Sequence, residues 1–142
     1  MGRVAGIDFG LKRIGIAISD ETKTIAMPLE TVIAEKHLNL TVGKLLKRLE
    51  EYELETFVVG MPYLMSGKVG HLADEVASFI KMLETYTKIP IITLDERLTS
   101  VQADRSLREG GMSRKKRAAR VDVVAAVLLL QCYLDRLSFE KF

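Results

Sequence analysis

The chain has 142 residues, the length of one ordinary domain, which excludes a multidomain protein. Its composition is 48% hydrophobic and 28% charged, which is typical of a globular protein and excludes a disordered one. The net charge of +2 is too small to establish a polyanionic partner by itself. We therefore expect a single domain over residues 1–142 with its own hydrophobic core.

A single cysteine, Cys132, excludes an intrachain disulfide, and no paired Cys/His pattern indicates a zinc site. No apolar run reaches the roughly 18 residues that a membrane span requires. The first residues lead into a strand-like segment and do not resemble a signal peptide. We therefore expect a cytoplasmic protein that has no membrane partner.

Three strands are predicted at the start of the chain. The β-rich runs 4–9 and 14–19 are separated by residues 10–13, which predicts an antiparallel hairpin. A third strand over about 24–33 contains Pro28. Because proline donates no ladder hydrogen bond, this strand is expected at a sheet edge or broken there.

Helices and strands then alternate. A hairpin followed by such alternation predicts an α/β fold, with a central mixed five-stranded sheet flanked by helices. Ligands of such sheets bind at the carboxyl ends of the strands. The predicted elements are a helix over 40–52, a buried strand over 56–60, a helix over 71–87, a buried strand over 89–94, and helices over 100–109 and 117–137.

Asp8 interrupts the otherwise apolar first strand. By strand alternation it shares a face with Val4 and Gly6, so its carboxylate is expected inside the fold or at the end of the sheet. A carboxylate there needs a metal, another cation or backbone donors. Alternatively, Asp8 belongs to a turn and bonds the hairpin backbone.

Asp95 and Glu96 directly follow an apolar strand and point to opposite faces by alternation. Only one of them is therefore expected in a given site, and we favour Glu96. The alternative is a strand end with an Asp helix cap and a surface ion pair to Arg97.

Asp122 lies in a helix stretch that is apolar nearly all round and is therefore expected to be buried. Ala125 and Ala126 share its face, and their small side chains allow a close approach to the sheet. The alternative is an acidic residue favoured by the helix dipole. If Asp8, Glu96 and Asp122 converge, their oxygens suit Mg²⁺. Two such ions about 3.5 to 4 Å apart would stabilise the attacking and leaving oxygens of an in-line displacement at phosphorus.

A basic run precedes Asp122. Cations at a helix start oppose the helix dipole, so a polyanion explains them better than local helix energetics, although a solvated helix start is the alternative. Aromatic residues make up only 6% of the chain, which favours contact with a nucleic-acid backbone over base stacking. The run is Arg114, Lys115, Lys116, Arg117 and Arg120, with Arg105 and Arg108 as a possible extension.

Residues 8–17, DFGLKRIGIA, resemble the opening signature of the YqgF (RuvX-like) family, and segments 58–62, 95–100 and 121–135 resemble its later motifs in order. The resemblance implies a ribonuclease-H-like fold related to the resolvase RuvC, and a Mg²⁺-dependent nuclease. It also implies Asp8, Glu96 and Asp122 as the acidic set. In many such enzymes the middle carboxylate leaves the fourth strand, where this chain has Gly60, so Glu96 would serve from the fifth.

The favoured hypothesis is an endonuclease that uses Mg²⁺, or Mn²⁺, on structured nucleic acid. The family resemblance implies maturation of the 5′ end of pre-16S ribosomal RNA, with Holliday junction resolution as the alternative. The protein would be a monomer or a homodimer, and a symmetric junction favours the dimer. Two other hypotheses are a non-catalytic nucleic-acid-binding module and an ATP-binding half-domain, for which the chain is short. The expected nucleic-acid contacts are Lys12, Arg13, Arg97, Arg114, Lys115, Lys116, Arg117 and Arg120.

Overall fold

The computed structural model describes residues 2–62, 70–98 and 114–140, and for residues 114–122 it describes the backbone. Five strands form one sheet in the order β3-β2-β1-β4-β5. The strands are β1 (Arg3–Phe9), β2 (Arg13–Ser19), β3 (Ala26–Ile33), β4 (Leu54–Met61) and β5 (Ile91–Asp95). The helices are α1 (Leu38–Leu49), α2 (His71–Tyr86) and α4 (Arg114–Glu140), together with the 3-10 helix η1 (Glu96–Leu98).

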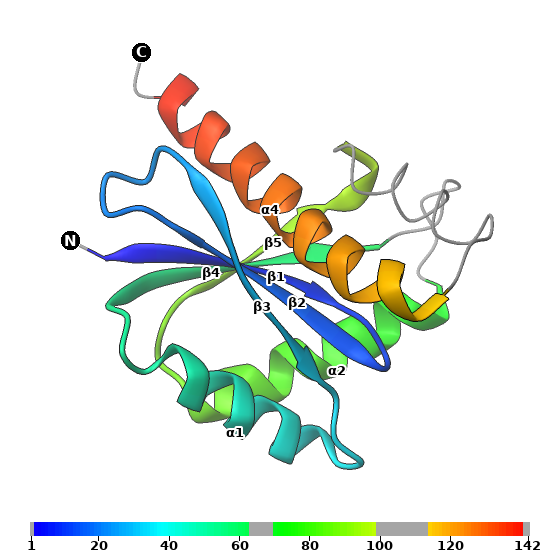
Figure 1. The fold of residues 1–142 in the computed structure, drawn as a ribbon. Coiled ribbons are helices and arrows are strands. Elements are labelled where there is room, and N and C mark those ends of the chain that lie inside the picture. Colours follow the sequence, from blue (N-terminus) through cyan, green and yellow to red (C-terminus); the bar gives the residue numbers. More distant parts are fainter. Residues whose placement is uncertain (1, 63–69, 99–113, 141–142) are drawn as a thin grey trace.

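The sheet is mixed, as the sequence predicts. β1 is antiparallel to β2 and parallel to β4, and β5 is parallel to β4. The carboxyl ends of β1, β4 and β5 therefore meet at one edge of the sheet. Helices α1 and α2 cover one face, and α4 crosses the other (Figure 1). The expected α/β architecture is confirmed.

The two edges of the sheet test two predictions. β3 lies at one edge, and its pairing with β2 shifts register beside Pro28, as expected for a residue that donates no ladder bond. A strand is present where one was predicted over 89–94, but the prediction that it is buried is wrong. β5 forms the other edge of the sheet and leaves Ile92 38% exposed. Helix α4 packs on β1, β2 and β3, so it does not cover β5 as it covers those strands.

Alternation divides the buried side chains between the two faces. Ile7 and Val59 pair across β1 and β4 and belong to the core under α1 and α2. In the same core the rings of Phe9 and Phe79 lie 4.9 Å apart, centroid to centroid. Val58 belongs to the second core, under α4.

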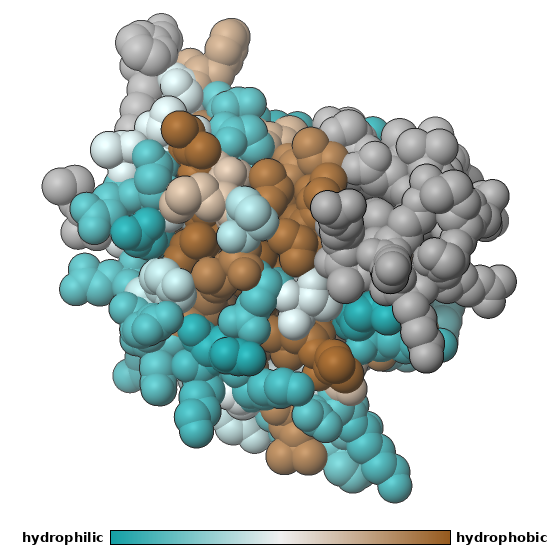
Figure 2. Space-filling model, in the orientation of Figure 1, coloured by the Kyte–Doolittle hydropathy of each residue, from teal (hydrophilic) through white to brown (hydrophobic). Residues whose placement is uncertain are grey.

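Helix α4 begins three residues earlier and ends three residues later than the predicted 117–137. Its apolar sequence predicts burial on all sides, and this prediction is wrong. The helix packs on the sheet with one side only and leaves Val124 49% exposed. Figure 2 shows hydrophobic side chains gathered in a band over this face of the molecule. The predicted helix over 100–109 lies outside the described residues. Within those residues, no helix combines the length and apolar character that a bilayer span requires.

Close contact between α4 and β1 depends on Gly6. A Cβ atom added there would lie 2.7 Å from the Cβ atom of Leu130 and 3.1 Å from the carbonyl oxygen of Ala126. Ala125 and Ala126 are fully buried, which agrees with the close approach expected from their size. Further along α4, the Gln131 side chain accepts a hydrogen bond from the backbone N–H of Ala26 at 2.9 Å, which ties the helix to the start of β3.

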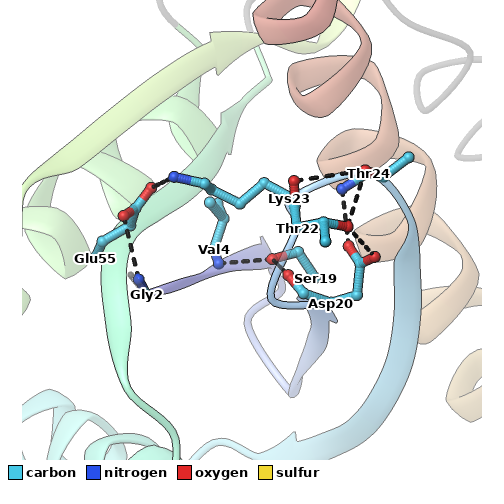
Figure 3. Close-up of polar contacts among 8 residues, drawn as sticks. All are labelled: Gly2, Val4, Ser19, Asp20, Thr22, Lys23, Thr24 and Glu55. Carbon is cyan, nitrogen blue, oxygen red and sulfur yellow. Dashed lines mark hydrogen bonds and ion pairs between the residues drawn. The ribbon is translucent and has the colours of Figure 1, made fainter.

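The loop between β2 and β3 closes the opposite end of the sheet (Figure 3). The Asp20 carboxylate accepts hydrogen bonds from the Thr22 hydroxyl at 2.6 Å and from the backbone N–H groups of Thr24 and Ile25 at 2.8 and 3.0 Å. Lys23, which has a φ of 58°, donates to the Glu55 carboxylate at 2.6 Å and so links this loop to β4.

The first prediction concerns Gly6. The substitution Gly6→Ala forces α4 away from β1, and we expect it to lower the free energy of unfolding by about 1 to 3 kcal/mol. Urea denaturation measures the change. The matched control is Gly43→Ala in α1, where an added Cβ meets nothing within 4 Å, so no loss is expected. Equal stability of Gly6→Ala and the wild type would contradict the packing described here.

The second prediction concerns pH. The Thr22 hydroxyl, followed by the Ile25 and Thr24 N–H groups, lowers the pKa of the Asp20 carboxyl from an ordinary 3.8 to about 2. Because the folded-state pKa is the lower one, this carboxylate contributes stability above pH 3.8, and the contribution is lost as the pH falls towards 2. Urea denaturation at several pH values should therefore show Asp20→Ala less stable than the wild type at pH 5, with a gap that narrows below pH 4. A gap independent of pH would argue against this role.

Candidate active site

Two buried carboxylates mark the carboxyl edge of the sheet. Asp8 in β1 is 2% exposed, and Glu96, the first residue of η1, is 0% exposed. Among the described residues, they are the only carboxylates in the buried class. Burial of a carboxylate is costly unless a cation or hydrogen bonds compensate it, so hydrophobic packing alone does not account for these two positions.

Both carboxylates lie on the α4 face of the sheet. Ile7 and Val59 belong to the opposite core, so the next residues along, Asp8 and Gly60, face α4 by alternation. The Glu96 carboxylate lies over Gly60, because a Cβ atom added to Gly60 would be 2.6 Å from its Oε1 atom. Neighbouring strands are about 4.8 Å apart, so the structure brings Asp8 and Glu96 to adjacent positions.

Asp95 has a different role. Its Oδ1 atom accepts the backbone N–H of Arg97 at 2.9 Å, and the Arg97 guanidinium reaches its Oδ2 atom at 2.6 Å. These hydrogen bonds from Arg97 hold the pKa of the Asp95 carboxyl below its usual value. The cap and ion pair weighed as the alternative therefore describe Asp95, and they do not describe Glu96. Arg97, an expected nucleic-acid contact, is bound to Asp95 in this structure.

The backbone of α4 also reaches this edge. Helix α4 runs from the carboxyl end of β1 towards its amino end (Figure 1), and Ala126 lies over Gly6. Asp122 is four residues before Ala126, or about 6 Å along the helix. Asp8 is two residues after Gly6, or about 6.6 Å along the strand. The backbone at residue 122 therefore lies towards the Asp8 end of β1, while the Asp122 side chain lies outside the described part of the structure.

Two cationic residues belong to the same edge. Lys12 is exposed in the loop between β1 and β2, and Arg13 begins β2. Gly15 pairs with Asp8, so alternation places Arg13 on the face of Asp8. The backbone of residues 114–120 forms the first turns of α4, and the side chains of its five predicted cations lie outside the described residues.

The described side chains include two candidate metal ligands, Asp8 and Glu96. Among the described residues, no group of three His, Cys, Asp or Glu residues gathers around one point. Asp8 and Glu96 offer carboxylate oxygens, the donors that Mg²⁺ and Mn²⁺ prefer. In the sequence, Gly60 is notable only because many ribonuclease-H-like enzymes have a carboxylate at this place in the fourth strand. Its steric relation to Glu96 becomes apparent when η1 is placed beside β4.

Relatives and solved structures agree with this description of the fold. The profile of the RuvX family, described as "Holliday junction resolvase", matches residues 2–136. A Protochlamydia amoebophila protein named "Putative pre-16S rRNA nuclease" is 53% identical over 139 residues, which cover 94% of this chain and 93% of that protein. A Bacillus subtilis protein of the same name is 37% identical over 137 residues, which cover 96% of this chain and 99% of that protein.

The chain also resembles Thermus thermophilus RuvC. The structure of that protein with a Holliday junction substrate gives a TM-score of 0.58 at 18% identity and covers 96% of both chains. RuvC alone gives a TM-score of 0.56 at 17% identity. This similarity shows that the fold is ribonuclease-H-like, as expected. The matches extend over nearly the whole sequence, and the chain belongs to the RuvX family.

Proposed function

We propose that this chain is a metal-dependent endonuclease that hydrolyses phosphodiester bonds near the 5′ end of pre-16S ribosomal RNA. The observation that carries the proposal is the pair of buried carboxylates, Asp8 and Glu96, on one face at the carboxyl edge of the sheet. The names of relatives that are 37% and 53% identical support the RNA substrate. This substrate also makes the cytoplasm the expected location.

The residues at this edge fit a divalent cation. Two buried negative charges at neighbouring positions repel each other, and a cation between them would offset both the repulsion and the cost of burial. Asp8 and Glu96 would hold Mg²⁺, or Mn²⁺, and Asp122 would complete the set from α4. When bound, the ion supplies Lewis-acid stabilisation of the charge that develops on the phosphate oxygens.

The remaining residues of the edge would bind and orient the substrate. Arg13, on the face of Asp8, would neutralise a phosphate oxygen near the scissile bond. Lys12, exposed in the adjacent loop, would hold a neighbouring phosphate. Neither contact reads a base, so the shape of the RNA and not its sequence would set the register.

Positive charge is concentrated in one segment of the sequence. Residues 99–122 contain seven Arg or Lys and three Asp or Glu, although the whole chain carries only +2. The rest of the chain is therefore net negative, and residues 114–120 of this basic segment form the first turns of α4. Such a segment would bind the phosphate backbone and release counterions. It comprises Arg105, Arg108, Arg114, Lys115, Lys116, Arg117 and Arg120.

Resolution of four-way DNA junctions is the second candidate. The family description names this activity, and it uses the same hydrolysis of a phosphodiester. Cutting two strands of one junction requires two active sites, so this function would require a homodimer, whereas a monomer suffices for RNA processing. We favour RNA because the two relatives described above carry the name of an RNA nuclease.

The third prediction is loss of cleavage in Asp8→Asn. This change removes a negative charge at nearly constant shape, so we expect metal-dependent cleavage to fall by about 10²-fold or more while RNA binding is retained. The assay compares a labelled pre-16S RNA fragment with a four-way DNA junction, in Mg²⁺, in Mn²⁺ and without metal. The matched control is Asp74→Asn, a change at an exposed carboxylate of α2.

Preferred cleavage of the DNA junction would select the second candidate function. RNA binding without cleavage by the wild type would indicate a non-catalytic binding module, and full activity of Asp8→Asn would remove Asp8 from the site.

The fourth prediction concerns the basic segment. We expect the double change Arg114→Gln and Lys115→Gln to weaken RNA binding about equally for all sequences. The slope of log affinity against log salt should become shallower by about 0.7 to 0.9 for each lost contact. Fluorescence anisotropy at several salt concentrations measures both effects. Lys47→Gln with Lys81→Gln, on exposed positions of α1 and α2, is the matched control, and an equal effect of the control pair would contradict a localised interface.

A further inference from the structure

We propose that Gly60 is a positioning residue of the metal site. Its missing side chain leaves the space over β4 in which the Glu96 carboxylate lies, so the site receives its second acidic group from the end of β5. This inference rests on the proposed function, since it assigns Glu96 to the same site. It goes further because it names the residue that leaves room for the Glu96 carboxylate.

The distances leave no room for a side chain at position 60. A Cβ atom added there would lie 2.6 Å from the Oε1 atom of Glu96, 3.1 Å from its Cγ atom and 3.2 Å from its Cδ atom. All three separations are shorter than an ordinary contact between such atoms, which is about 3.5 Å or more. Even alanine, the smallest change, therefore requires the whole carboxylate end of Glu96 to move.

Glu96 has little freedom to move aside without leaving the site. It is 0% exposed, and its backbone is flanked by two fixed points. Before it, Leu94 pairs with Gly60 in the sheet. After it, the hydrogen bonds between Arg97 and Asp95 hold the start of η1. A methyl group on Gly60 would therefore turn the carboxylate away from its position beside Asp8.

Gly6 and Gly60 lie on the same face of neighbouring strands, yet they meet different partners. An added Cβ at Gly6 meets the backbone and a side chain of α4, whereas at Gly60 its nearest contacts are all atoms of the Glu96 side chain. Substitution of Gly6 should therefore act through the packing of α4, independently of the side chain at position 96. Substitution of Gly60 should change metal affinity, and its effect should depend on the side chain at position 96.

The fifth prediction is a double-mutant cycle between positions 60 and 96. The variants are Gly60→Ala, Glu96→Ala and the double substitution, with Gly43→Ala as the control. Mn²⁺ alone is the probe, its affinity is measured by electron paramagnetic resonance, and urea denaturation without metal gives stability. We expect Gly60→Ala to weaken Mn²⁺ binding by about 10- to 100-fold and to have less than a twofold effect when Glu96 is already alanine.

Stability provides an independent test of the same coupling. Gly60→Ala should destabilise the chain that contains Glu96 and should be tolerated in the Glu96→Ala background, where the space is vacated. If Gly60→Ala alone does not fold, recovery of folding in the double variant still supports the proposal. The Gly43→Ala control should bind Mn²⁺ like the wild type.

Unchanged Mn²⁺ affinity in Gly60→Ala would overturn the proposal, and so would an equal loss of stability in both backgrounds. A wild-type chain that binds no Mn²⁺ would instead contradict the proposed function. The denaturation half of the cycle would still decide whether Gly60 acts on Glu96.

Discussion

The burial of two carboxylates on one face of the sheet is the constraint on which the rest of the site depends. Asp8 and Glu96 lie at the ends of strands that run in the same direction, so the topology gathers them at one edge. Carboxylates so placed repel each other and lose their hydration, and a divalent cation relieves both effects. Under the proposed function, α4 would add Asp122 to this pair and the nearby cations would bind phosphates. The space over β4 accommodates the Glu96 carboxylate.

Two glycines make that arrangement possible in different ways. Gly6 allows the backbone of α4 to approach β1, so that the start of α4 lies towards the Asp8 end of that strand. Gly60 leaves room for the carboxylate of Glu96. Both glycines lie on the face of the sheet that packs against α4, and the chemistry proposed for this edge would come from groups at the strand ends and from α4.

Local patterns in the sequence predict much of this architecture. Strand alternation places Asp8 on the face of Gly6, and Pro28 identifies an edge strand. Contacts distant in sequence are harder to predict, and they explain the differences. The apolar run of β5 resembles a buried strand, yet its place at the sheet edge depends on where α4 packs. Gly60 shows no steric role until Glu96, 36 positions later in the sequence, is placed over it.

Metal-dependent cleavage by this member of the RuvX family requires that Asp8 and Glu96 together bind a divalent ion. The most direct test is anomalous X-ray diffraction from crystals of the wild-type chain soaked in Mn²⁺. We expect a manganese peak within coordination distance of both carboxylates, about 2.0 to 2.3 Å from their oxygens. A well-ordered structure with no peak there, or with manganese bound only elsewhere, would contradict it.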